Sequence, residues 1–184
     1  MPRIVRKRRK RGSDDAMSER KASYSRKTKE TDISCEITPD SSETIDIATT
    51  LPFFDHLLHA MAFHGGFGLF LKGKGDTDVD PHHLVEDTGI VLGETFARLV
   101  EDHGSVRRYG HSVIPMDDAL SEVTIDVCGR PHLVLDAEWP QTRSGNFDMA
   151  LIKEFLAGLA ARAKINPHAH TRYGENSHHM AESL

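Results

Sequence analysis

Apolar residues recur along this chain at the three- and four-residue spacing that is typical of amphipathic helices. The first such series follows Pro52, which suits the first turn of a helix because its missing N–H would have no helical partner there. Gly65 and Gly66 then end the series. The pattern predicts helices over residues 52–63, 82–101 and 148–163, and a fourth helix that begins at Ser177 near the end of the chain.

Segments of extended character separate these helices. The predicted strands are residues 21–33, 44–47, 67–72, 121–127, 132–137 and 165–172. Two of them flank Cys128-Gly129-Arg130-Pro131, whose glycine and proline favour a turn, so residues 121–137 are predicted to form a hairpin. The order of strands, helix, strand and helix occurs twice, over residues 21–104 and 105–184. We therefore expect an α+β domain made of two half-repeats, with β-sheet packed against helices and an internal pseudo-two-fold repeat.

Composition and charge narrow the class of protein. Apolar residues make up 38% of the 184 residues, and no apolar run approaches the roughly 20 residues that span a bilayer. No membrane association is expected. The two cysteines have no CxxC spacing, which favours a cytoplasmic location over a disulfide scaffold. Seven basic and no acidic residues lie within positions 1–12, in a chain whose net charge is −5. Such a block can bind anionic surfaces, but we expect residues 1–20 to be a disordered basic arm, and the acidic remainder argues against a nucleic-acid partner.

The chemistry is concentrated in a doubled His-His-x-x-Glu element. It occurs at His82-His83-Leu84-Val85-Glu86 and again at His178-His179-Met180-Ala181-Glu182, each time at the start of a predicted helix. The first histidine and the glutamate of each element are four residues apart and share one helix face, so each pair can hold one metal ion. The second histidine lies about 100° further around the helix and must face another site. Imidazole and carboxylate without thiolate suit Mn²⁺, Fe²⁺ or Zn²⁺. From its surroundings alone, His56 is as readily a core histidine as a ligand.

Eight segments of the chain resemble the imidazoleglycerol-phosphate dehydratase family, and they cover nearly everything from Arg26 to the end. They are RKTKETDI (26–33), LPFFDHLLHAMAFHGGF (51–67), GDTDVDPHHLVEDTGIVLG (75–93), RRYG (107–110), PMDDAL (115–120), CGRP (128–131), GNFD (145–148) and GENSHHMAES (174–183). The resemblance implies a ribosomal-S5-domain-2-like fold. It also implies a hydro-lyase of histidine biosynthesis that converts D-erythro-imidazole glycerol phosphate to imidazole acetol phosphate through an imidazolate-type intermediate.

The resemblance further implies two Mn²⁺ ions per active site. One ion would be held by His56, His83, His178 and Glu182. The other would be held by His82, Glu86, His179 and a residue of the third helix, where this chain has Glu154 and many relatives have histidine. The implied substrate contacts are Glu30, His56, His64, His82, His83, Glu86, Arg108, Arg130 and His178. Glu30, Glu86 and His64 are the candidates for proton transfer, and which of them is the base stays open.

The family also implies a homo-oligomer, a shell of twenty-four subunits with active sites shared between them. Family members continue past the fourth helix with a further phosphate-binding segment, so the resemblance leads us to expect that the chain is truncated at Leu184. Two other functions are compatible with the metal ligands alone, namely a metal-dependent assembly or storage protein and a dinuclear phosphoester hydrolase. Glu30, Arg108 and Arg130 would be superfluous in an assembly protein.

Overall fold

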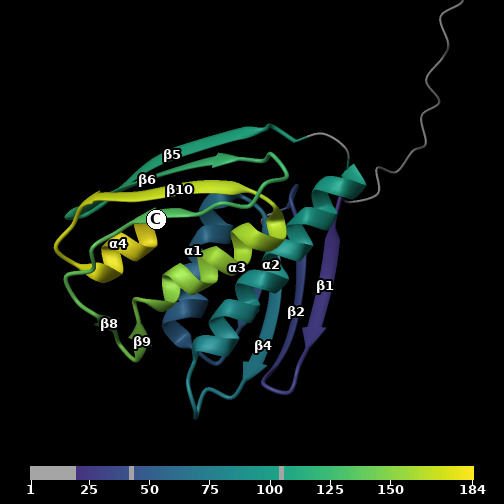
Figure 1. The fold of residues 1–184 in the computed structure, drawn as a ribbon, viewed down its shortest axis with the longest axis horizontal. Helices are drawn as coiled ribbons and strands as arrows, with labels where there is room; N and C mark the ends of the chain where they lie inside the picture. The colour runs from purple at the N-terminus through teal and green to yellow at the C-terminus, as the bar shows by residue number, and fades with distance from the viewer. Residues whose placement is uncertain (1–19, 42–43, 104–105) are drawn as a thin grey trace, which may run out of the picture.

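A computed structural model describes residues 20–41, 44–103 and 106–184, and it has two four-stranded sheets with helices between them (Figure 1). The first sheet and its helices consist of β1 (Ala22–Lys27), β2 (Thr31–Thr38), β3 (Ile45–Ala48), α1 (Pro52–Gly65), β4 (Gly68–Gly75) and α2 (His82–His103). The second consists of β5 (Tyr109–Met116), β6 (Ala119–Asp126), β7 (Val134–Asp136), α3 (Leu151–Ala163), β10 (Asn166–Tyr173) and α4 (Ser177–Ser183). A small hairpin of β8 (Arg143–Ser144) and β9 (Phe147–Asp148) precedes α3. Apart from Arg20, the predicted basic arm lies outside the described residues.

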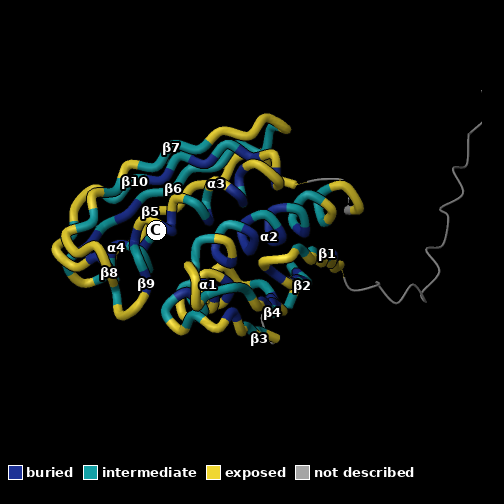
Figure 2. The backbone as a smooth tube through the Cα atoms, turned by 60° about the horizontal axis from the view of Figure 1, so that its bottom comes forward, coloured by how far each residue is buried: buried dark blue, intermediate teal, exposed yellow. Residues whose placement is uncertain are grey.

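The two sheets have the same topology. Their strand orders are β1-β2-β4-β3 and β5-β6-β10-β7, and in each the last pair is parallel while the others are antiparallel. The repeat therefore equates α1 with α3 and α2 with α4. This confirms the duplicated α+β fold, and Figure 2 shows the two sheets on opposite sides of the helices. No helix in the described part of the chain is long and apolar enough to cross a membrane.

The second sheet corrects two strand predictions. Residues 121–137 do not form a hairpin, because β10 lies between β6 and β7. The loop after β6 is bound to the start of β10 instead, where the Gly129 and His132 amides donate to the carbonyls of Lys164 and Ile165. Strand β5 was not predicted, because it is an edge strand with seven of eight residues exposed and therefore has no apolar alternation.

The first sheet and the helices need smaller corrections. Residues 21–33 are two strands rather than one, since the Thr28 hydroxyl accepts hydrogen bonds from the amides of Glu30 and Thr31 and closes a turn. Helix α1 begins at Pro52 as expected, and Gly66 ends it with a left-handed φ of 70°. Helix α3 begins three residues later than predicted because Asp148 belongs to β9.

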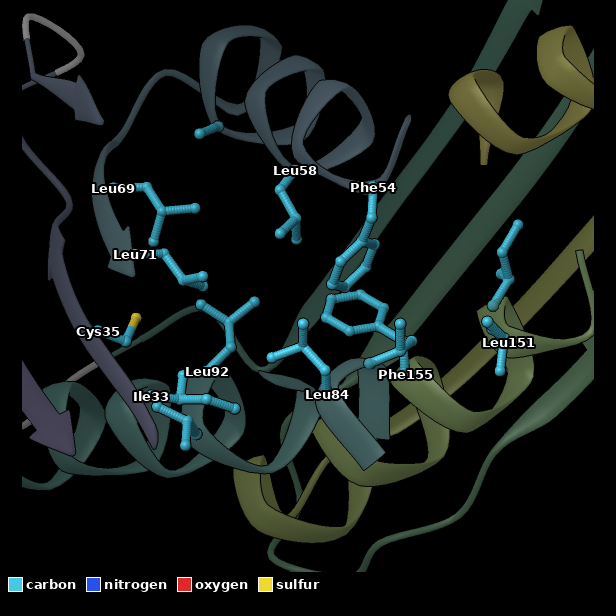
Figure 3. Packing of buried hydrophobic residues seen from close by; sticks show 14 of the residues in the cluster. Ile33, Cys35, Phe54, Leu58, Leu69, Leu71, Leu84, Leu92, Leu151 and Phe155 are labelled. Carbon is cyan, nitrogen blue, oxygen red and sulfur yellow. The ribbon is translucent and has the colours of Figure 1, made fainter. Parts of the chain in front are cut away.

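The core is centred on the packing of α1, α2 and α3 against the first sheet. Figure 3 shows Leu58 of α1 and Leu84 of α2 pointing toward Leu71 of β4. Helices α2 and α3 approach each other closely. A Cβ placed on Gly89 of α2 would lie 2.2 Å from the carbonyl oxygen of Phe155, so a side chain cannot be accommodated at this crossing.

Candidate metal centre

Three potential metal ligands from two helices converge at one point. His56 Nε2 of α1 lies 3.0 Å from the Glu182 Oε2 atom of α4, and His178 Nε2 lies 3.1 Å from the same oxygen. Within residues 20–41, 44–103 and 106–184, this is the only group of three or more His, Cys, Asp or Glu side chains whose ligand atoms all lie within 4.8 Å of one another. Two imidazoles and a carboxylate are a suitable donor set for Mn²⁺, Fe²⁺ or Zn²⁺.

The local packing orients this cluster. His178 and Glu182 are one turn apart on α4, and the Phe53 ring contacts the His178 ring edge-on with centroids 5.0 Å apart. Burial raises the pKa of the Glu182 carboxyl, but the hydrogen bonds and charges of His56 and His178 outweigh burial and leave that pKa below its ordinary value. The cluster therefore favours an ionised carboxylate, which is the form that binds a cation.

Helix α4 has only seven residues, and an isolated helix of this length is unstable in water. Side chains from elsewhere in the chain hold it in place. The Ser177 amide donates to Gln141 Oε1 at 2.7 Å, and the Gln141 amide donates to Ser177 Oγ at 2.8 Å. At the other end of the helix, the Ser121 and Ser183 hydroxyls are 2.7 Å apart. These contacts fix the position from which His178 and Glu182 project.

The second histidine of each doubled element has a different environment. His179 Nδ1 lies 2.6 Å from Asp118 Oδ1, and His83 Nδ1 lies 3.1 Å from Asp76 Oδ2. The hydrogen bond to Asp118 raises the pKa of His179, and the bond from His179 holds the pKa of Asp118 well below its usual range. The hydrogen bond to Asp76 likewise raises the pKa of His83, and the negative charge of Glu30 adds to this effect. The sequence pattern indicated no role for Asp76 or Asp118, because Asp76 precedes the predicted helix of His83 and Asp118 is 61 residues from His179.

The first doubled element does not form a compact cluster within one chain. His82 Nε2 and Glu86 Oε2 share a face of α2 at 3.7 Å, and the Asp80 carboxylate accepts a hydrogen bond from the His82 amide at 2.7 Å. His83 does not belong to the cluster that contains His56. One chain therefore brings together three of the four residues expected for one ion, and the pair His82–Glu86 of the set expected for the other.

Glu154 lies on the helix face expected for a ligand of the second ion. It is half-buried and stands one turn before Gly158, where a Cβ would lie 2.8 Å from the carbonyl oxygen of Glu86. Residues four apart share a helix face, so Glu154 faces the beginning of α2. The repeat equates this α3–α2 pair with the α1–α4 pair that carries His56 and Glu182.

The predicted phosphate contacts lie far from the cluster. Arg108 donates two hydrogen bonds to Asp126, at 2.7 and 3.1 Å, where β5 begins and β6 ends. Arg130 is exposed in the loop that follows β6. Helix α4 packs at the opposite end of these strands, through Asp118 and Ser121. On β6, the five residues from Ser121, which contacts α4, to Asp126 correspond to about 17 Å, at about 3.3 Å per residue.

The two remaining residues predicted to contact the substrate, Glu30 and His64, lie on separate elements. Glu30 lies in the turn between β1 and β2, close enough to His83 to influence its pKa. His64 is in the last turn of α1, exposed, with its ring edge-on to Phe63 at 5.2 Å between centroids. In one chain, therefore, His64 does not join the His56–His178–Glu182 cluster.

Comparison with known proteins finds relatives that belong to one enzyme family. The family model of imidazoleglycerol-phosphate dehydratase matches residues 49–184. The chain is 44% identical over 168 residues to the imidazoleglycerol-phosphate dehydratase of Acidithiobacillus ferrooxidans, covering 91% of this chain and 84% of that protein. It is 45% identical over 165 residues to the enzyme of Lacticaseibacillus casei, covering 90% and 85%.

Solved structures give the same result. The crystal structure of imidazoleglycerol-phosphate dehydratase from Staphylococcus aureus superposes with a TM-score of 0.80 at 31% identity, covering 89% of this chain and 91% of that one. The Pyrococcus furiosus enzyme in complex with (S)-C348 superposes with a TM-score of 0.74 at 35% identity, covering 87% and 85%.

Proposed function

Since the chain belongs to the imidazoleglycerol-phosphate dehydratase family, we propose that it dehydrates imidazole glycerol phosphate at Mn²⁺ sites built from more than one subunit. Its relatives identify it as a hydro-lyase of histidine biosynthesis. Membership of this family excludes the two other functions that the metal ligands alone allowed, namely an assembly or storage protein and a phosphoester hydrolase. The observation that carries the metal proposal is the His56–His178–Glu182 cluster.

We assign two Mn²⁺ ions to each site. His56, His178 and Glu182 would hold one ion, with His83 contributed by another subunit because it lies outside the cluster of its own chain. His82, Glu86, Glu154 and His179 would hold the other. Carboxylate and imidazole donors support this assignment, and Glu154 lies on the face of α3 that turns toward Glu86.

The separation of Arg108 from the cluster supports shared sites. Imidazole glycerol phosphate is shorter than the roughly 17 Å between Ser121, where β6 contacts α4, and Asp126, which binds Arg108. We therefore propose that one molecule does not contact the cluster and Arg108 of the same chain. A substrate held by both must bridge two subunits. We therefore propose a closed homo-oligomer, in keeping with the twenty-four-subunit shell expected from the resemblance.

The reaction removes a hydroxyl from the carbon beside the imidazole ring and a proton from the next carbon, and the resulting enol tautomerises to the ketone. A Mn²⁺ ion held by these histidines and glutamates would supply Lewis acidity toward the imidazole ring of the substrate. Arg108 and Arg130 would bind the phosphate, because a guanidinium is planar and permanently charged. Glu30, whose charge acts on His83, and Glu86, which lies 3.7 Å from His82, are our candidates for the base, and His64 is a candidate relay.

The proposal is tested by measuring Mn²⁺-dependent formation of imidazole acetol phosphate. Activity should disappear after chelation and return with Mn²⁺, and Glu182→Gln should lower kcat/KM by at least about 100-fold. Glu138→Gln, at an exposed position outside the cluster, is the control and should retain wild-type activity. Full activity after chelation, or in Glu182→Gln, would contradict the proposal. The cytoplasmic location and the absence of a nucleic-acid partner stay predictions.

A further inference from the structure

The two histidines of each doubled element use their ring nitrogens differently. In His178 and His82, Nε2 faces the glutamate of the same helix, at 3.1 Å from Glu182 and 3.7 Å from Glu86. In His179 and His83, Nδ1 faces an aspartate from another segment of the chain. The second histidines thus have Nδ1 occupied by a carboxylate, and this arrangement occurs in both halves of the repeat.

We propose that Asp118 and Asp76 are positioning residues that hold His179 and His83 in the tautomer with the proton on Nδ1, so that Nε2 is the metal-binding atom. This inference rests on the metal site of the proposed function. A carboxylate accepts the Nδ1–H hydrogen bond, and the nitrogen that carries the proton is set by the bond that the ring makes. The other nitrogen then presents its lone pair, and the carboxylate also increases the basicity of the ring.

The two aspartates reach the same role from different elements. Asp118 lies in the turn between β5 and β6, whereas Asp76 follows β4. Duplication alone would place the carboxylate at equivalent positions in the two halves. The two aspartates come from non-equivalent positions, yet each faces the Nδ1 atom of its histidine. The duplicated backbone therefore does not explain the hydrogen bond, whereas a role for the histidine does.

Asp118 has a second task that Asp76 lacks. Its Oδ2 atom accepts hydrogen bonds from the amides of Glu175 and Asn176, with the latter at 2.9 Å, and thereby anchors the segment that enters α4. The only hydrogen bonds in the described part of the chain that involve the Asp76 side chain are those to His83. A substitution of Asp76 therefore tests ring orientation alone, whereas a substitution of Asp118 also affects the anchoring of α4. An asparagine at position 118 keeps a carbonyl oxygen for the backbone amides but places an NH2 donor, in place of the carboxylate acceptor, against His179 Nδ1.

The first measurement is nitrogen-15 NMR of histidine-labelled wild-type protein, free of metal, at about pH 9, where the imidazoles are neutral. We expect His179 and His83 to carry the proton on Nδ1. A proton on Nε2 of these rings would overturn the proposal. Because this readout involves neither metal nor turnover, it stands even if the enzyme proves inactive, so failure of the proposed function is distinguished from failure of this inference.

The second measurement is calorimetric titration of Mn²⁺ into Asp118→Asn and Asp76→Asn. We expect binding about 10- to 100-fold weaker for each, together with a proton shift toward Nε2. Exposed carboxylates that contact none of the proposed ligands provide the controls, and Asp78→Asn and Glu138→Gln should bind Mn²⁺ within about twofold of wild type. If Asp118→Asn proves unstable, Asp76→Asn gives the answer, since its side chain anchors no backbone. Wild-type affinity and tautomer in Asp76→Asn would overturn the proposal.

Discussion

The Nε2 atom of His56 and the Oε2 atom of Glu182 lie 3.0 Å apart although the two residues are 126 positions apart in the sequence. One belongs to α1 in the first half of the repeat and the other to α4 in the second. The cluster therefore depends on the packing of the two halves, and a change that separates them should release metal before the individual halves unfold.

The crossing of α2 and α3 is the first feature to test. Gly89→Ala places a methyl group where a Cβ would be 2.2 Å from a backbone oxygen, which cannot move without shifting α3. Overpacking of this kind costs about 1–3 kcal/mol, so we expect a lower free energy of unfolding by about 2 kcal/mol in thermal or urea denaturation. Gly110→Ala meets no atom within 4 Å and should change the stability by less than about 0.5 kcal/mol. Equal stabilities for the two variants would disprove the close crossing.

Gln141 should control the order of α4. Gln141→Ala removes the side-chain hydrogen bonds to the Ser177 amide and the Glu175 carbonyl, each worth about 1 kcal/mol. We expect faster hydrogen exchange of the amides in residues 177–183 and weaker Mn²⁺ binding, because His178 and Glu182 lose their fixed position. Glu138→Ala, three residues earlier and exposed, serves as control. Unchanged exchange in Gln141→Ala would show that α4 is held by other contacts.

Cys35 should resist modification in the folded protein. Burial raises the pKa of its thiol from 9.0 to about 12, and its exposed fraction is 2%. Since the reactive species is the thiolate, iodoacetamide at about pH 8 should label Cys128 and leave Cys35 unmodified until denaturant is added. The contribution of the buried neutral thiol to the stability of the folded protein is complete below pH 9.0 and is lost as the pH rises toward 12. Mass spectrometry of the labelled peptides is the check, and rapid native labelling of Cys35 would refute its burial.

Glu154 is the residue of α3 that we propose as a ligand of the second ion. Glu154→Ala should weaken one of two Mn²⁺ sites and sharply lower turnover, whereas Glu154→His should retain much of both, because imidazole and carboxylate both bind Mn²⁺. Lys153→Ala, next to it and exposed, is the control. If Glu154→Ala binds two Mn²⁺ per subunit with wild-type affinity, Glu154 is not a ligand.

Local geometry could be predicted from the sequence, whereas long-range contacts could not. The pairing of His178 with Glu182 follows from the four-residue spacing on a helix, and the structure confirms their proximity. The helices were predicted because their apolar faces pack against a core. Strand β5 was missed because an exposed edge strand needs no apolar alternation.

Partners from other elements had no local signal. Asp118 reaches His179 across 61 residues through the sheet-to-helix packing, and β10 enters between β6 and β7 from far along the chain. The inclusion of His56 among the ligands came from the family resemblance, since its immediate neighbours are equally compatible with a core histidine.

In the proposed oligomer, the metal cluster and the phosphate-binding arginines of one active site come from different subunits. Arg108→Ala and Glu182→Gln should each be inactive alone. When they are co-expressed with different tags and isolated as mixed oligomers, about one quarter of the sites combine an intact Arg108 from one subunit with an intact Glu182 from another under random assembly. We predict that dehydratase activity returns to about this fraction of wild type. Mixed oligomers as inactive as the two parents would contradict the claim.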